Sequence, residues 1–141
     1  MRFWDTSAIV PLCVTEPASA KVRRLLDADS SIVVWWATRV ECLSALARRR
    51  RDGVLGAPAE AQARRVLVAL AGAWSEVVPS ERLRQRTERL LSLHAVRAAD
   101  AFHLAAALLW SRGETTGEAF VSFDERLRDA ASREGFLVLP D

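Results

Sequence analysis

Short apolar runs that favour β-strands alternate with longer helical patterns along the whole chain of 141 residues. The runs predicted as strands are Arg2–Asp5, Ile32–Trp35, Glu76–Val78, Ala119–Phe123 and Phe136–Leu139. The segments predicted as helices are Ala8–Val14, Ala18–Ala28, Thr38–Arg51, Ala59–Trp74, Ser80–Leu93, Arg97–Trp110 and Glu125–Arg133. This alternation is typical of α/β proteins, in which helices cover both faces of a central parallel sheet. Because the length suits one core, we expect a single domain over residues 1–141.

Polar residues mark the starts of several predicted helices. We expect Thr6 or Ser7 to cap the first helix, because a side-chain hydroxyl can accept a hydrogen bond from a free backbone N–H group. Thr38 and Glu41 form a Thr-x-x-Glu pattern, which is typical of a capping box. Ser80 is expected to cap the helix that follows it.

The segment Arg97–Trp110 is apolar almost all the way round its predicted helix, which indicates a buried, central position. Its first turn nevertheless carries Asp100. A buried carboxylate is costly unless something compensates its charge. The helix N-terminus, the neighbouring Arg97, or a cation shared with other carboxylates are the three candidates for that compensation.

Three other acidic residues are expected near Asp100. Asp5 ends the first predicted strand, Asp124 follows the fourth, and Glu41 lies in the first turn of a helix. In parallel α/β sheets, ligands bind at the carboxyl ends of the strands, and the acids are predicted at that edge. Taken singly, Glu41, Asp100 and Asp124 also have a purely structural interpretation as helix-start residues. Together the acids favour a bound cation, because gathered like charges repel one another unless a cation neutralises them.

The side-chain chemistry indicates which metal would bind. Carboxylate oxygens suit Mg²⁺ or Mn²⁺, and the sequence has no Cys cluster or His-x-x-x-His pattern that would favour Zn²⁺. The periodicity predicts that Val40, Leu43 and Ala47 form the buried stripe of their helix, with Glu41 nearly opposite Leu43. A solvated capping role and metal binding therefore both stay open for Glu41.

These acids lie in four short motifs: Asp5-Thr6-Ser7, Glu41 in Arg-Val-Glu-Cys-Leu-Ser-Ala-Leu, Asp100 in Ala-Ala-Asp-Ala-Phe-His-Leu-Ala-Ala-Ala, and Phe-Val-Ser-Phe-Asp124. In order and spacing the motifs resemble the PIN-domain ribonucleases, most closely the VapC-type toxins of toxin–antitoxin pairs. The resemblance implies a PIN-like α/β domain whose acidic quartet, Asp5, Glu41, Asp100 and Asp124, binds Mg²⁺ or Mn²⁺ and cleaves RNA. It also implies supporting hydroxyl groups at Ser7 and at Ser122, where Thr is also usual.

Hydrolysis of a phosphodiester bond fits these residues. The reaction needs a polarised phosphoryl oxygen, an activated water and stabilisation of developing charge, all of which divalent ions supply. No nucleophilic side chain is then required. His103 follows Asp100 by three residues on the same helix face. We expect it to be a packed histidine on the inner surface, with a role as general base as the alternative.

Basic residues are a weaker guide to RNA binding. The formal net charge is only +2, so the composition does not by itself indicate a nucleic-acid partner. Arg48–Arg51 is predicted at a helix end, where the arginines are either solvated and favoured by the dipole or bound to the RNA backbone. Arg39 and Arg48 are our candidates for RNA binding. The tryptophans are expected in the core or an interface rather than as stacking platforms for bases.

The helices carry more apolar surface than the core of one small sheet needs, which is typical of an interface. The residues concerned are Val66, Leu67, Leu70 and Trp74, together with Leu25, Leu26, Leu43 and Leu46. The resemblance implies a homodimer whose acidic groove is masked by a VapB-like antitoxin. A basic side chain of the antitoxin would be favoured in the cation pocket.

Two lone cysteines, Cys13 and Cys42, suit a reducing cytoplasm better than a disulfide scaffold. We expect no signal peptide and no membrane span. A phosphate-accepting receiver domain is excluded, because such domains need a late active-site lysine and the only lysine is Lys21. Rossmann and P-loop proteins are excluded because their Gly-rich motifs are missing. A PIN-like module that binds partners without catalysis is the remaining alternative.

Overall fold

The computed structural model describes residues Met1 to Asp141. Five strands form one sheet in the order β3-β2-β1-β4-β5, and all neighbouring strands are parallel. The strands are β1 Arg2–Trp4, β2 Ile32–Trp35, β3 Ser75–Val77, β4 Ala119–Val121 and β5 Leu137–Leu139. The predicted parallel α/β fold is confirmed, and the first strand of the chain is the central strand of the sheet.

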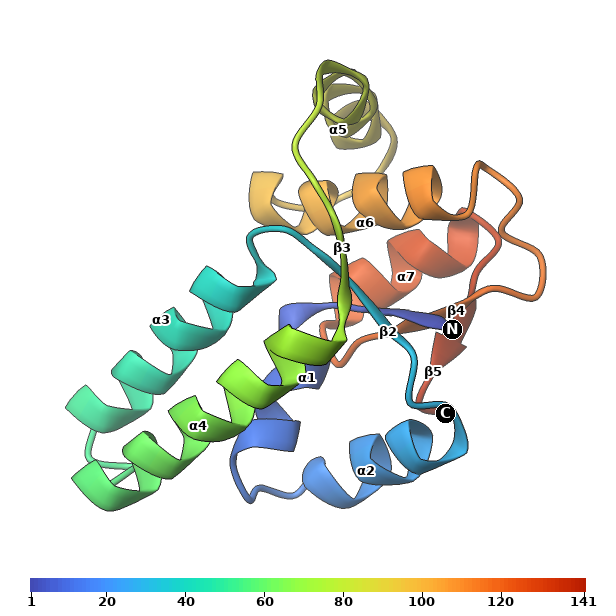
Figure 1. Ribbon diagram of the computed structural model, residues 1–141. Coiled ribbons are helices and arrows are strands. Elements are labelled where there is room, and N and C mark those ends of the chain that lie inside the picture. The colour runs from blue at the N-terminus through green and yellow to red at the C-terminus, as the bar shows by residue number, and fades with distance from the viewer.

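Helices cover both faces of this sheet (Figure 1). They are α1 Thr6–Cys13, α2 Ser19–Ala28, α3 Thr38–Arg51, α4 Ala57–Ala73, α5 Glu81–Leu93, α6 Ala98–Trp110 and α7 Glu125–Arg133. The helices α5, α6 and α7 pack on one face, and α1 to α4 pack on the other. No helix combines the length and the apolar character needed to cross a membrane.

Successive side chains of β1 enter different cores. Phe3 stacks on Phe120 beneath α6, with ring centroids 5.4 Å apart. The next residue, Trp4, packs on the opposite face among residues of α1, α3 and α4. This two-residue period is what a strand covered on both faces requires. The helix α6 is as central as its sequence predicts, since every residue from Leu104 to Leu108 is buried.

The capping predictions for α1 and α3 are wrong. The helix α1 begins at Thr6 directly after Asp5, so Thr6 and Ser7 lie inside the helix rather than at its cap. The helix α3 begins at Thr38 itself, whose Oγ1 is buried without a hydrogen-bond partner. Glu41 does not close a capping box, because its carboxylate is hydrogen-bonded to other helices. Thr6 and Glu41, which the pattern assigns to caps, make contacts between helices instead.

The buried stripe of α3 also differs from the prediction. Thr38, Cys42 and Leu46 are its buried residues, whereas Val40 is 66% exposed. Positions four residues apart lie on one helix face, so this stripe is as regular as the predicted one. An apolar periodicity does not select the stripe of Thr38, Cys42 and Leu46, because Thr and Cys are less apolar than Val. A free Cys nevertheless packs as a small hydrophobic residue.

Most apolar side chains that we expected at an interface pack within the chain itself. Leu46, Leu67 and Trp74 are buried, because α3 and α4 both pack against α1. The partly buried members, Leu25, Leu26, Leu43, Val66 and Leu70, rest against the same core. The apolar surface of these helices is therefore used mainly to build one face of the sheet.

Candidate active site

The four predicted acids come together in one cavity of about 310 Å³. Asp5 follows β1, Asp124 follows β4, and both therefore lie at the carboxyl edge of the sheet. Asp100 comes from the first turn of α6, and Glu41 from the first turn of α3. The rest of the lining is Thr6, Ser7, Val10, Ala45, Arg49 and His103.

Asp5 is the most deeply placed acid, with only 4% of its surface exposed. Its Oδ1 accepts a hydrogen bond of 2.7 Å from the hydroxyl of Ser7. Burial raises the pKa of the Asp5 carboxyl to about 6, although His103 and the Ser7 hydrogen bond act in the opposite direction. The ionised form of Asp5 is thus held at an energetic cost in the metal-free protein.

Ser7 and Ser122 join the two strand ends that carry Asp5 and Asp124. The Ser7 hydroxyl accepts a hydrogen bond of 2.8 Å from the backbone N–H of Phe123 and lies 3.4 Å from the Ser122 hydroxyl. Ser122 in turn accepts from the backbone N–H of Asp124 at 3.1 Å. These contacts place both serines directly behind the acids, where supporting hydroxyl groups were predicted.

Asp100 and Asp124 stand at the starts of two helices. Asp124 caps α7, and its Oδ1 accepts a hydrogen bond of 2.9 Å from the N–H of Leu127. Burial, and then the negative charge of Asp124, raise the pKa of Asp100. The two carboxylates therefore repel each other across the cavity.

Glu41 is bound to His103. The Nε2 atom of His103 lies 3.1 and 3.0 Å from the two carboxylate oxygens of Glu41, and Thr6 donates to one of them at 3.2 Å. Burial alone would lower the pKa of His103, but the hydrogen bond and charge of Glu41 and the charges of Asp5 and Asp100 outweigh it and raise the pKa.

His103 is buried, as predicted, but it is not merely packed among apolar neighbours, since it fixes the Glu41 carboxylate. The sequence indicates only that His103 faces the acidic site. His103 follows Asp100 by three residues, and this spacing places both side chains on the same side of α6.

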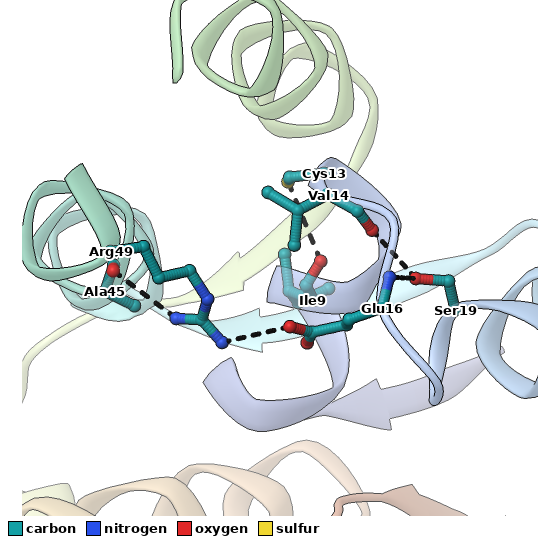
Figure 2. A network of polar contacts seen from close by, with 7 residues as sticks. All are labelled: Ile9, Cys13, Val14, Glu16, Ser19, Ala45 and Arg49. Carbon is teal, nitrogen blue, oxygen red and sulfur yellow. Dashed lines mark hydrogen bonds and ion pairs between the residues drawn. The ribbon is translucent and has the colours of Figure 1, made fainter. Parts of the chain in front are cut away.

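Arg49 lines the cavity, whereas the sequence singles out Arg48 from the run Arg48–Arg51. Glu41, Ala45 and Arg49 follow one another at four-residue spacing on α3, and all three line the cavity. Figure 2 shows Arg49 held between two partners: its guanidinium donates to the carbonyl of Ala45 and to Glu16, each at 3.3 Å. The predicted RNA-binding residues Arg39 and Arg48 are exposed and do not line this cavity.

The donor set fits a hard divalent cation. The carboxylates of Asp5, Asp100 and Asp124 form no direct ion pair with any Lys, Arg or His. Oxygen ligands of this kind are those that Mg²⁺ and Mn²⁺ prefer. No three of the acidic, His or Cys side chains are already gathered at metal-cluster spacing.

The chain is similar to known proteins over its full length. Ribonuclease VapC47 of Mycobacterium tuberculosis is 31% identical over 142 aligned residues, which cover 98% of this chain and 95% of the relative. Ribonuclease VapC45 of the same species is 31% identical and covers 98% of this chain and 94% of the relative.

Solved structures share the fold. VapC20 of Mycobacterium tuberculosis, a toxin that cleaves the sarcin–ricin loop, superposes with a TM-score of 0.67 at 18% identity, covering 97% of each chain. FitAcB from Neisseria gonorrhoeae superposes with a TM-score of 0.68 at 18% identity, covering 99% of this chain and 97% of the other. The sequence model of the PIN domain matches residues 2–132, so this chain, with its acids at the carboxyl edge of a parallel sheet, belongs to the PIN-domain family.

Proposed function

We propose that this protein is a metal-dependent ribonuclease and a VapC-like toxin, and that its one domain extends over residues 1–141. The observation that carries the proposal is the cavity in which Asp5, Asp100 and Asp124 meet without a direct ion pair to any basic side chain. The names of the curated relatives, both ribonucleases, support RNA as the substrate. Mg²⁺ or Mn²⁺ is the proposed cofactor, because the ligands offered are carboxylate oxygens.

The acids have distinct roles in this proposal. Asp5, Asp100 and Asp124 would hold the cation, with Glu41 as the fourth member of the metal-binding and catalytic quartet. The chemistry that the bound ion supplies is polarisation of a phosphoryl oxygen and activation of water. His103 and Thr6 hold the Glu41 carboxylate in one orientation at the wall of the cavity. Ser7 and Ser122 keep Asp5 and Asp124 in place.

RNA binding by Arg39 and Arg48 stays part of the proposal, at the outer surface of α3. Their exposure leaves both side chains open to phosphate groups, which is the contact that basic residues make without regard to sequence.

The proposed partners are a co-encoded antitoxin and a second copy of the chain. A toxin–antitoxin complex from Klebsiella pneumoniae superposes with a TM-score of 0.64, covering 88% of this chain and 87% of that chain. An antitoxin could place a basic side chain among the acids of the cavity, where its charge is favoured. The proposed site of action is the cytoplasm, which agrees with two free, buried cysteines.

A cleavage assay tests the catalytic proposal. Purified protein should cut RNA with Mg²⁺ or Mn²⁺ and stop in EDTA. Asp100→Asn should lower the cleavage rate at least about a hundredfold, because a catalytic metal supplies several kcal/mol of transition-state stabilisation. Asp129→Asn is the matched control, since Asp129 is an exposed acid paired with Arg133 on α7.

The outcomes separate the two candidate functions. Full activity of Asp100→Asn in EDTA would refute metal-dependent catalysis by the quartet. RNA that is bound but never cut, with either metal, would identify the protein as a catalytically idle binding module.

A further inference from the structure

A second hollow adjoins the acidic cavity. It has a volume of about 560 Å³ and lies where α6 and α7 begin. Its lining is Arg97, Ala99, Asp100, Asp124, Glu125 and Arg126. Because Asp100 and Asp124 line both spaces, the hollow continues directly from the acidic cavity.

The two arginines of this hollow are available to a ligand. Arg97 and Arg126 are exposed, and neither forms an ion pair within the chain. Glu125, on the same rim, is unpaired as well and so neutralises neither of them. The arginine of the acidic cavity, Arg49, is in contrast already bound to Glu16 (Figure 2). Arg97 and Arg126 are thus the unpaired guanidinium groups that line these two spaces.

The positions of Arg97 and Arg126 do not stabilise their helices. Arg97 is the N-cap residue of α6, and Arg126 lies in the first turn of α7. The positive end of a helix dipole disfavours a cation at these positions. The arginines at the end of α3 lie, by comparison, where the dipole favours them. A reason other than helix stability is needed for two cations at two helix starts.

We propose that Arg97 and Arg126 bind the RNA phosphate next to the one that is cleaved, and so hold the strand across the acidic cavity. This inference rests on the proposed ribonuclease function. A guanidinium group pairs with two phosphate oxygens at once, whatever the attached base. The contact therefore supplies affinity and register rather than sequence choice. Both residues are positioning residues, because the acids, not the arginines, face the cleaved phosphate.

A purely structural role for the arginines predicts a change in stability without a change in RNA affinity. If Arg97 and Arg126 only offset the charge of Asp100 and Asp124 from nearby, their removal should lower the melting temperature of the metal-free protein. RNA affinity would then be unchanged.

The test compares Arg97→Gln/Arg126→Gln with the wild type. The control is Arg23→Gln/Arg24→Gln, which removes two exposed, unpaired arginines from α2. Figure 1 shows α2 and α6 on opposite sides of the sheet. Steady-state cleavage of a single-stranded RNA with Mg²⁺ gives kcat and KM. Fluorescence anisotropy of the same labelled RNA with Ca²⁺, which accepts oxygen ligands in a looser geometry, gives affinity as a function of salt.

The proposal predicts a KM raised roughly tenfold or more in the Arg97→Gln/Arg126→Gln protein, with kcat within about twofold of wild type. The slope of log affinity against log salt should fall by about 0.7, the value for one lost phosphate contact to a single strand. The control variant should behave as wild type. Unchanged KM and salt slope, or an equal loss in the control, would overturn the proposal.

The two proposals fail separately. A wild-type protein that cuts no RNA but binds it through Arg97 and Arg126 would refute the ribonuclease function and leave this binding site standing. If the wild type cuts RNA and both variants keep its KM, the ribonuclease function stands and the arginine binding site is refuted.

Discussion

Replacing Asp5 by Asn should stabilise the metal-free protein at neutral pH. Burial is the main reason that the pKa of Asp5 rises from 3.8 to about 6. This difference corresponds to about 3 kcal/mol, by which ionisation of Asp5 lowers the free energy of unfolding. Asn carries no charge and keeps an oxygen that accepts the hydrogen bond of Ser7. The variant should therefore gain up to about 3 kcal/mol, which is a large part of the stability of a domain.

The effect has a defined pH window. Below pH 3.8 the Asp5 carboxyl is protonated in the folded and unfolded chain alike, so ionisation costs nothing. As the pH rises through the unfolded value towards about 6, the unfolded chain releases its proton first, and the wild type loses stability relative to the variant. Above about pH 6 the free energies of unfolding of Asp5→Asn and the wild type differ by the full amount.

Urea unfolding in EDTA between pH 4 and pH 8 measures this difference. Mg²⁺ at a hundred times its Kd should then restore about 2.7 kcal/mol to the wild type and less to Asp5→Asn. Asp129→Asn serves as the control, because Asp129 is exposed. The reasoning fails if Asp5→Asn is no more stable than wild type at pH 8, or if both proteins follow the same pH dependence.

Two further predictions concern a tight turn and the assembly. Gly135→Ala should destabilise the fold by roughly 1–3 kcal/mol, because Gly135 has φ +95° and a new Cβ would lie 2.6 Å from Oγ1 of Thr115. Gly72→Ala, in the exposed side of α4 with nothing within 4 Å, should be neutral or stabilising in the same thermal melt. Light scattering should show a homodimer, and a tight inhibitory complex once the co-encoded antitoxin is added. A monomer at tens of micromolar that ignores the antitoxin would contradict both expectations.

The sequence predicts the sheet well because its signals are local. The strand Ile32–Trp35 and the helix Glu125–Arg133 have the predicted bounds, and Ser80 caps α5 as expected. Each depends on apolar runs or caps that act within a few residues. Strand ends are less certain, since β4 stops at Val121 rather than Phe123.

The details of the site depend on contacts between distant segments. Glu41 and His103 are separated by 62 residues, so no local pattern reveals that they share hydrogen bonds. A capping box is the best local explanation of Glu41, and tertiary contacts override it. Arg49 rather than Arg48 reaches the cavity for the same reason, because a run of arginines does not show which member faces inward. The packing of α3 on α1 and α4 decides which arginine side chain faces the cavity.

The central place of β1 in the sheet determines when the acids can meet during synthesis. Phe3 pairs with Phe120, and the N–H of Phe123 reaches Ser7 across 116 positions of the chain. Such long-range pairings close late, because the entropy of a large loop must first be overcome. A growing chain on the ribosome carries Asp5 from the start of synthesis but gains Asp124 much later. The acidic cavity therefore cannot form before the chain has been made past Asp124.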